Sequence, residues 1–261
     1  MDRSNIEKIA KNPDDRVLLA KLFDKINAGM RKNIPASTCF LSPRELEMAR
    51  FLFGQQEGLF TFGGYPDAER KMLVYLPDYL EENALHQEDS PLVCLRAVFY
   101  EGDAPTHRDF LGALMGAGIA RETVGDICVG KGSCTFFVTA EIAAYIQQNL
   151  ISAGRAKLRL EQIPCDEVQI EAQEVKEIRD TLASLRLDSV ISSGFRVSRG
   201  SAVEYISAGK AAINGLPCEK PDKAVAEGDK ISVRGLGKIL LNSVNGQTKK
   251  GRISVVIHRY L

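Results

Sequence analysis

The sequence predicts an α+β protein of three segments: an N-terminal α/β unit at residues 1–80, a middle domain at 81–180 and a small C-terminal domain at 181–261. The chain of 261 residues is longer than most single domains. Runs with helical periodicity alternate with short apolar runs typical of strands. Charge is also uneven, because residues 181–261 hold 13 Lys and Arg against 6 Asp and Glu, whereas the rest holds 21 against 28.

The basic character of the C-terminal segment favours a polyanionic partner for it, since the protein as a whole is neutral. A basic surface that is simply solvated would have the same charge. Charge alone therefore leaves both interpretations open.

In the N-terminal segment, residues 14–32 are predicted to be helical, with apolar residues spaced by three and four. A second helix is expected at 42–53, where Ser42 is a candidate N-cap followed by Pro43 and Glu45. Two strands are expected at 58–64 and 71–77.

The middle segment has the order β-α-β-β-α-β, which is the ferredoxin-like arrangement. Strands are expected at 92–100, 125–130, 134–140 and 155–163, and helices at 107–118 and 140–150. RNA-recognition motifs use the same order, and "KGSCTFFV" resembles one of their strands, with Phe136 and Phe137 as candidate stacking rings. Because neighbouring strand residues face opposite sides, at most one of the two rings can be free.

The C-terminal segment is predicted to contain two short helices followed by strands. The first helix is expected to end at Gly194, and Ser198 to cap a second that ends at Gly209. Strands are expected at 210–214, 229–235, 238–244 and 252–258, with Asn245 and Gly246 as a hairpin turn. Residues 171–184 are interpreted as a bridge to this segment.

The composition argues against export, membrane insertion and metal binding. The first residues lack the apolar stretch of a secretory signal, and no apolar run is long enough to cross a bilayer. The six cysteines have no C-x-x-C spacing, and the three histidines, His86, His107 and His258, do not cluster with them. We therefore expect a cytoplasmic protein with reduced thiols, without a metal or cofactor.

Three stretches come close to catalytic motifs. "GDICVGKG" at 125–132 lacks the hydroxyl residue of a P-loop and precedes a predicted strand rather than a helix. "HRDF" at 107–110 resembles a kinase catalytic loop without its companion motifs. "RLDSVISSGF" at 186–195 resembles pseudouridine synthases, whose Asp would correspond to Asp188, but little chain remains after it for a catalytic domain.

Residues 185–238 hold a basic rim around two short helices. The stretch contains R-L-D at the first helix, Ser198-Arg199, Gly209, Asn214-Gly215 and "V-x-EGD-x-ISVRG". This pattern closely resembles the S4 domain, a small RNA-binding fold of the αL type. Guanidinium groups match phosphate oxygens in pairs, and lysine adds point charge. The candidate RNA-binding residues are Arg186, Arg196, Ser198, Arg199, Lys210, Asn214, Lys230, Arg234 and Lys238.

The whole chain resembles the YlmH family of S4-domain proteins, most clearly in "RDFLGALMGAGIARETVGDICV" at 108–129. The resemblance implies a non-catalytic, cytoplasmic bacterial protein that is monomeric when free. It implies binding to ribosomal RNA of the large subunit and to peptidyl-tRNA, in ribosome-associated quality control. Arg196, Ser198, Arg199 and Lys210 would then contact ribosomal RNA or tRNA.

Two other functions remain open from the sequence. One is an S4-tethered RNA-modifying enzyme of the pseudouridine synthase type, using Asp188. The other is a cell-division-linked scaffold whose RNA binding is incidental.

Overall fold

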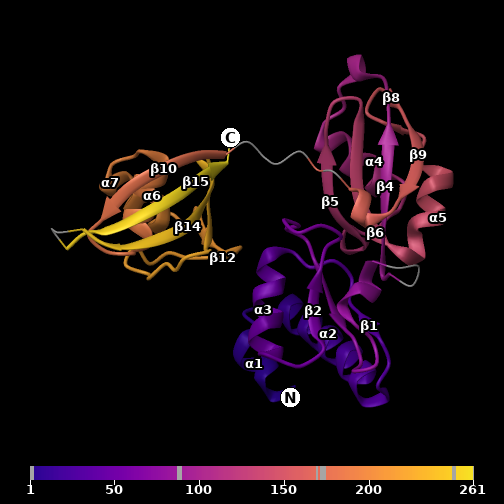
Figure 1. The fold of residues 1–261 in the computed structure, drawn as a ribbon, viewed down its shortest axis with the longest axis horizontal. Coiled ribbons are helices and arrows are strands. Elements are labelled where there is room, and N and C mark those ends of the chain that lie inside the picture. Colours follow the sequence, from indigo (N-terminus) through magenta and orange to yellow (C-terminus); the bar gives the residue numbers. More distant parts are fainter. Residues whose placement is uncertain (1–2, 87–89, 169, 171–174, 249–250, 261) are drawn as a thin grey trace. The chain divides into compact units, whose positions relative to one another are not determined.

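The computed structural model describes residues 3–86, 90–168, 170, 175–248 and 251–260 (Figure 1). The chain forms two compact units, Met1–Glu171 and Ala172–Leu261. The N-terminal and middle segments thus pack together as one unit. Across the described residues, no helix is both long and apolar enough to span a bilayer.

The first part of unit 1 packs helices against a small antiparallel sheet in the order β1-β3-β2. Asn12 and Ser42 cap the two longer helices, and Glu45 completes a capping box with Ser42. The predicted helix at 42–53 is therefore confirmed. The elements are η1 (Arg3–Asn5), α1 (Ile6–Ile9), α2 (Pro13–Lys32), β1 (Ala36–Ser37), α3 (Pro43–Phe53), β2 (Leu59–Phe62), β3 (Met72–Tyr75) and η2 (Glu82–His86).

The second part of unit 1 is a four-stranded antiparallel sheet in the order β5-β6-β4-β9. Helix α4 contacts β5, and α5 contacts β4 and β6. A short hairpin, β7 with β8, lies between α5 and β9 in the chain. The elements are β4 (Leu92–Val98), η3 (Glu101–Asp103), α4 (His107–Gly116), η4 (Arg121–Thr123), β5 (Val124–Val129), β6 (Ser133–Thr139), α5 (Ala140–Asn149), β7 (Ser152–Ala153), β8 (Ala156–Lys157), β9 (Arg159–Ile163) and η5 (Cys165–Glu167).

Both faces of this four-stranded sheet are buried in part, while the side chains of Arg96 and Glu161, on the same face as Phe137, are 34% and 43% exposed. Phe136 faces the core formed with α4 and α5, whereas Phe137 faces a second core that includes Phe40, Phe62 and Met72 of the N-terminal part. Both phenylalanines are 0% exposed. Neither candidate stacking ring is therefore free to stack on a base, because α4 and α5 cover Phe136 and the N-terminal part covers Phe137.

Polar contacts also join the two parts of unit 1. The Asp126 carboxylate on β5 accepts hydrogen bonds from the Tyr65 hydroxyl at 2.9 Å and from the backbone N–H groups of Glu69 and Arg70 at 2.7 and 3.1 Å. Burial and the neighbouring Asp126 raise the pKa of Tyr65, so its hydroxyl stays protonated and donates. The Arg70 guanidinium in turn donates to the carbonyls of Phe40 and Val124, each at 3.0 Å.

Unit 2 is a six-stranded antiparallel sheet in the order β10-β15-β14-β13-β11-β12, and α6 packs on β10, β14 and β15 (Figure 1). Apolar residues of α6 and α7, among them Leu187, Ile191 and Ile206, form one core with the strands. The elements are β10 (Val175–Leu182), α6 (Leu187–Phe195), α7 (Arg199–Ser207), β11 (Ala211–Ile213), β12 (Leu216–Pro217), β13 (Lys230–Val233), β14 (Gly237–Gln247) and β15 (Ile253–Tyr260).

Two local features of unit 2 differ from the sequence-based expectation. The described part of the expected bridge at 171–184 contains β10, an edge strand that pairs along its length with β15, while residues 171–174 lie outside the described residues. Asn245 and Gly246 lie within β14, at an irregularity in its pairing with β15, rather than in a hairpin turn. Both differences reflect strand pairing with β15, which is distant in the chain from β10 and next in the chain after β14.

Candidate nucleic-acid interface

A buried carboxylate holds two arginines at the start of the helix pair in unit 2. Asp188 lies in the first turn of α6, and its side chain is 3% exposed. Arg186 donates to Asp188 from Nε at 3.2 Å and from Nη2 at 3.1 Å. Arg199, the first residue of α7, also donates to it from Nε at 3.1 Å. One carboxylate therefore fixes two guanidinium groups whose outer parts reach solvent.

Asp188 remains ionised in this arrangement. Burial alone would raise its pKa, but hydrogen bonds and charge from Arg199 and Arg186 outweigh burial, and the pKa lies below its ordinary value. The backbone N–H of Ser189 donates to the same carboxylate at 2.8 Å. Because both oxygens are engaged by donors, Asp188 is a structural anion here rather than an accessible base or nucleophile.

The junction between α6 and α7 presents Arg196 and Ser198. Arg196 is the C-cap residue that follows α6, and it has the left-handed conformation with φ 56° and ψ 42°. The Ser198 hydroxyl caps α7 by accepting from the backbone N–H of Ser201 at 3.0 Å. The predicted cap is confirmed, but the predicted end of α6 at Gly194 is wrong, since the helix continues to Phe195.

Gly194 has a packing role instead. A Cβ atom at this position would lie 2.7 Å from Ile239 Cδ1, so glycine allows α6 to approach β14 closely. The left-handed position falls two residues later, on Arg196.

The remaining candidate residues lie on the strands and turns of unit 2. The ammonium group of Lys210 lies 5.4 Å from the centre of the Tyr205 ring. The backbone N–H of Arg234 donates to the carbonyl of Lys210 at 2.9 Å, which brings these two cations close in the fold. Lys230 begins β13, and Lys238 lies on β14 opposite Ser232.

Asn214 serves the turn that contains it. Its side-chain nitrogen donates to Asp229 at 2.8 Å, and its side-chain oxygen accepts from the backbone N–H of Lys230 at 2.9 Å. Asn214 has a φ of 49°, a conformation that asparagine tolerates better than most residues. The amide therefore fixes the turn beside the strand that bears Lys230.

Sequence reasoning did not identify Arg179 or Arg252 as candidate residues. Both line a pocket between β10 and α6 that also includes Arg196 and Arg199. A basic run at residues 249–252 was the only signal in the sequence. That run could not show that Arg252 contacts β10, because the contact is formed by tertiary pairing.

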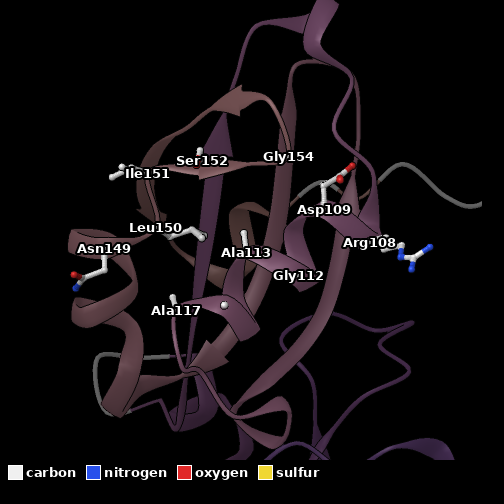
Figure 2. Close-up of a pocket in the computed structure, with 11 residues that line it drawn as sticks. Arg108, Asp109, Gly112, Ala113, Ala117, Asn149, Leu150, Ile151, Ser152 and Gly154 are labelled. Carbon is white, nitrogen blue, oxygen red and sulfur yellow. The ribbon is translucent and has the colours of Figure 1, made fainter.

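A second groove, of about 630 Å³, lies beside α4 in unit 1 (Figure 2). Figure 2 shows Arg108 and Asp109 at one end of the groove, and Asn149 and Ile151 at the other. Its floor is made largely of small residues such as Gly112. Arg108 is the one cation among its described lining residues, so positive charge is less concentrated here than around α6 and α7.

The described residues contain no cluster of three or more His, Cys, Asp or Glu side chains arranged to hold a metal. Five of the six cysteines are poor nucleophiles: burial raises the pKa of Cys128 and of Cys165 to about 11, and it also raises the pKa of Cys39, Cys94 and Cys134.

The chain matches family models in each of its two units. Residues 103–167 match the family model "Putative RNA-binding domain in YlmH", and residues 185–231 match the S4 domain. The chain is 35% identical over 224 residues to the ribosome-associated protein quality control protein P2 of Bacillus subtilis, covering 85% of this chain and 86% of the relative. The solved cell division protein ylmH from Streptococcus pneumoniae shares the fold, with a TM-score of 0.50 and 20% identity over 61% of this chain and 98% of that one. The chain belongs to the YlmH family of S4-domain proteins.

Proposed function

We propose that this protein is a non-catalytic RNA-binding factor, and that its S4 domain binds the phosphate backbone. The observation that carries this proposal is the buried Asp188 carboxylate, which holds Arg186 and Arg199 at the starts of α6 and α7. Guanidinium groups held in place lose less conformational freedom when they bind phosphate, and they can donate to it in pairs. Arg196 adds a third guanidinium at the junction of the two helices.

We further propose that the RNA belongs to the ribosome. The Bacillus subtilis relative is named for ribosome-associated protein quality control. By extension, this chain would bind ribosomal RNA of the large subunit, and peptidyl-tRNA held there, while a stalled chain is processed in the cytoplasm. Lys210, Lys230, Arg234 and Lys238 would extend the contact along the strands of unit 2.

The middle domain has the strand order of an RNA-recognition-like fold, and we propose that it is a variant of that fold with a different mode of contact. In such folds aromatic residues of the sheet stack on bases. Here Phe137 on the corresponding face is covered, because Tyr65 of the N-terminal part stacks on it with ring centres 5.3 Å apart. Any contact of this domain with RNA would therefore not use these rings, and in our proposal the domain orients the protein or meets a second partner.

The enzyme alternative lacks a suitable nucleophile at its expected position. A pseudouridine synthase would need Asp188 to reach a uridine, whereas the Asp188 side chain is 3% exposed and bonded to two arginines. The high pKa values of the buried thiols also argue against cysteine chemistry near neutral pH.

Sedimentation of cell lysate in a sucrose gradient tests the proposal. The wild-type protein is expected to migrate with free large subunits, and an Arg196→Ala/Arg199→Ala variant to remain near the top. A Lys157→Ala/Lys176→Ala variant is the matched control, because it removes two exposed cations that belong to neither helix of the pair. Wild-type protein that stays at the top would contradict ribosome binding, and co-migration of the arginine variant would contradict the assigned contact.

A further inference from the structure

The pocket between β10 and α6 has a volume of about 530 Å³ and is lined by four arginines. Arg196 and Arg199 belong to the helix pair, whereas Arg179 lies on β10 and Arg252 just before β15. The last two lie outside residues 185–231, the part that the S4 model matches. The pocket is therefore formed jointly by the S4 domain and by the strands that flank it.

Not all of this positive charge is neutralised within the protein. Arg179 pairs with Glu177 at 2.7 Å, and Arg199 pairs with Asp188. Arg252 instead donates from Nε to the neutral hydroxyl of Thr181 at 2.9 Å. No side-chain hydrogen bond or ion pair of Arg196 is found among the described residues.

The polar residues that line the pocket do not neutralise the remaining positive charge. Asp180 is the acidic side chain among the described lining residues, and it accepts a hydrogen bond from the Ser193 hydroxyl at 2.6 Å. Ser189 and Ser192 line the α6 side of the pocket with further hydroxyl groups. Two of the four arginines are paired with Glu177 and Asp188, so Arg196 and Arg252 carry more charge than Asp180 can neutralise. The three serine hydroxyls already donate within the protein, to Asp188, to the carbonyl of Val197 and to Asp180, so the donors left for a ligand are guanidinium groups.

The backbone at Arg196 supports a role for its side chain. A left-handed conformation is unfavourable for a residue other than glycine, yet an arginine occupies this position. Such an exception is a reason to look for a function of the side chain. Here the left-handed turn brings Arg196 to the wall of the pocket.

We infer that this pocket binds a phosphate group of the RNA backbone, with Arg196 and Arg252 donating to it. The inference rests on the proposed function and extends the RNA contact beyond the S4 domain. A phosphodiester within the RNA chain fits better than an isolated phosphate, because a second cationic site adjoins the pocket. Arg199 lines the pocket, and its partner Asp188 also holds Arg186. Cations thus continue from the pocket along the helix pair, as a chain of successive phosphates requires.

The test compares two full-length variants that each lose one positive charge. Arg252→Gln removes the charge inside the pocket and keeps a side-chain donor for Thr181. Lys176→Gln removes an exposed charge on β10 that does not line the pocket. The measurement is fluorescence anisotropy of a labelled RNA hairpin with a 5′-hydroxyl end, across a range of salt concentrations. We expect Arg252→Gln to weaken binding about tenfold and to lower the log–log salt slope by about one unit.

Lys176→Gln should change the RNA affinity and the log–log salt slope much less than Arg252→Gln does. The unfolding midpoints of both variants should stay close to that of the wild type. Equal effects of the two variants, with Arg199→Ala still impairing binding, would overturn the pocket assignment and leave the proposed function intact. A wild-type protein that fails to bind RNA would overturn the proposed function itself. Binding that requires a 5′-phosphate, or that inorganic phosphate abolishes at unchanged ionic strength, would show that the pocket takes a terminal or free phosphate instead.

Discussion

Arg199 and Asp188 lie eleven positions apart in the chain, yet the Arg199 guanidinium donates to the buried Asp188 carboxylate at 3.1 Å. This pair connects the first residue of α7 to the first turn of α6. Arg186 joins the same carboxylate, so loss of one acidic side chain would release two arginines. If the proposed function holds, we expect stability and RNA binding to be coupled at this site.

Asp188→Asn should weaken both stability and RNA binding. Removing one partner of a buried ion pair costs several kcal/mol, but both arginines are partly exposed, which reduces the effect. We expect a loss of about 1 to 3 kcal/mol in the free energy of unfolding, measured by urea denaturation. Unchanged stability together with unchanged RNA affinity would contradict the structural role of Asp188.

Acidification should destabilise the wild-type protein more than Asp188→Asn. The folded-state pKa of Asp188 is depressed, so its contribution to stability is complete above the ordinary value of about 3.9 and is lost as pH falls through the lower folded value. Denaturation curves at pH 7 and at successively lower pH should show the difference between the two proteins shrinking below about pH 4. A difference that stays constant down to the lowest pH would contradict an ionised Asp188.

Arg196→Gly should separate stability from binding. Glycine relieves the left-handed conformation at the end of α6, although it also increases the freedom of the unfolded chain. We expect the free energy of unfolding to stay equal or to rise by about 0.5 kcal/mol, while RNA affinity falls. A variant that loses stability and binding in parallel would instead indicate that Arg196 supports the fold.

Asp126→Ala should loosen the N-terminal part from the middle sheet. The substitution leaves three donors without their acceptor: the Tyr65 hydroxyl and the N–H groups of Glu69 and Arg70. A loss of about 2 kcal/mol is expected in the free energy of unfolding. Asp67→Ala, at an exposed position nearby, is the control and should change it by less than about 0.5 kcal/mol.

Two glycine substitutions in unit 1 should have opposite effects. Gly64 has a φ of 90°, and a Cβ there would lie 2.4 Å from the Phe137 ring, so Gly64→Ala should destabilise the protein by at least about 2 kcal/mol. Gly112 lies within α4 with open space around it, so Gly112→Ala should stabilise the protein by up to about 1 kcal/mol. Thermal unfolding of both variants checks the pair, and a stabilising Gly64→Ala would contradict the close contact between the N-terminal part and the sheet.

Local signals in the sequence were sufficient where the structure depends on neighbouring residues. Ser198 caps α7 and Ser42 caps α3 as predicted, because a cap needs only a side chain and the backbone three residues later. The S4 domain could be identified for a similar reason, since its helices, turns and basic residues lie within one short stretch. The sequence could not show that Arg196, rather than Gly194, takes the left-handed conformation at the end of α6. Gly194 is needed instead because Ile239, which is distant in the chain, packs closely against it.

The sequence by itself determined the class of fold, the helix pair with the Ser198 cap of α7, and most of the basic residues, because helical periodicity, capping and charge are local properties. Tertiary structure decided which of these residues act together. It brought Asp188 to Arg186 and Arg199, added Arg252 to the pocket between β10 and α6, and covered Phe137 with the N-terminal part. The physical reason is that burial and strand pairing depend on segments far apart in the chain, so they are fixed only when the sheets and cores form.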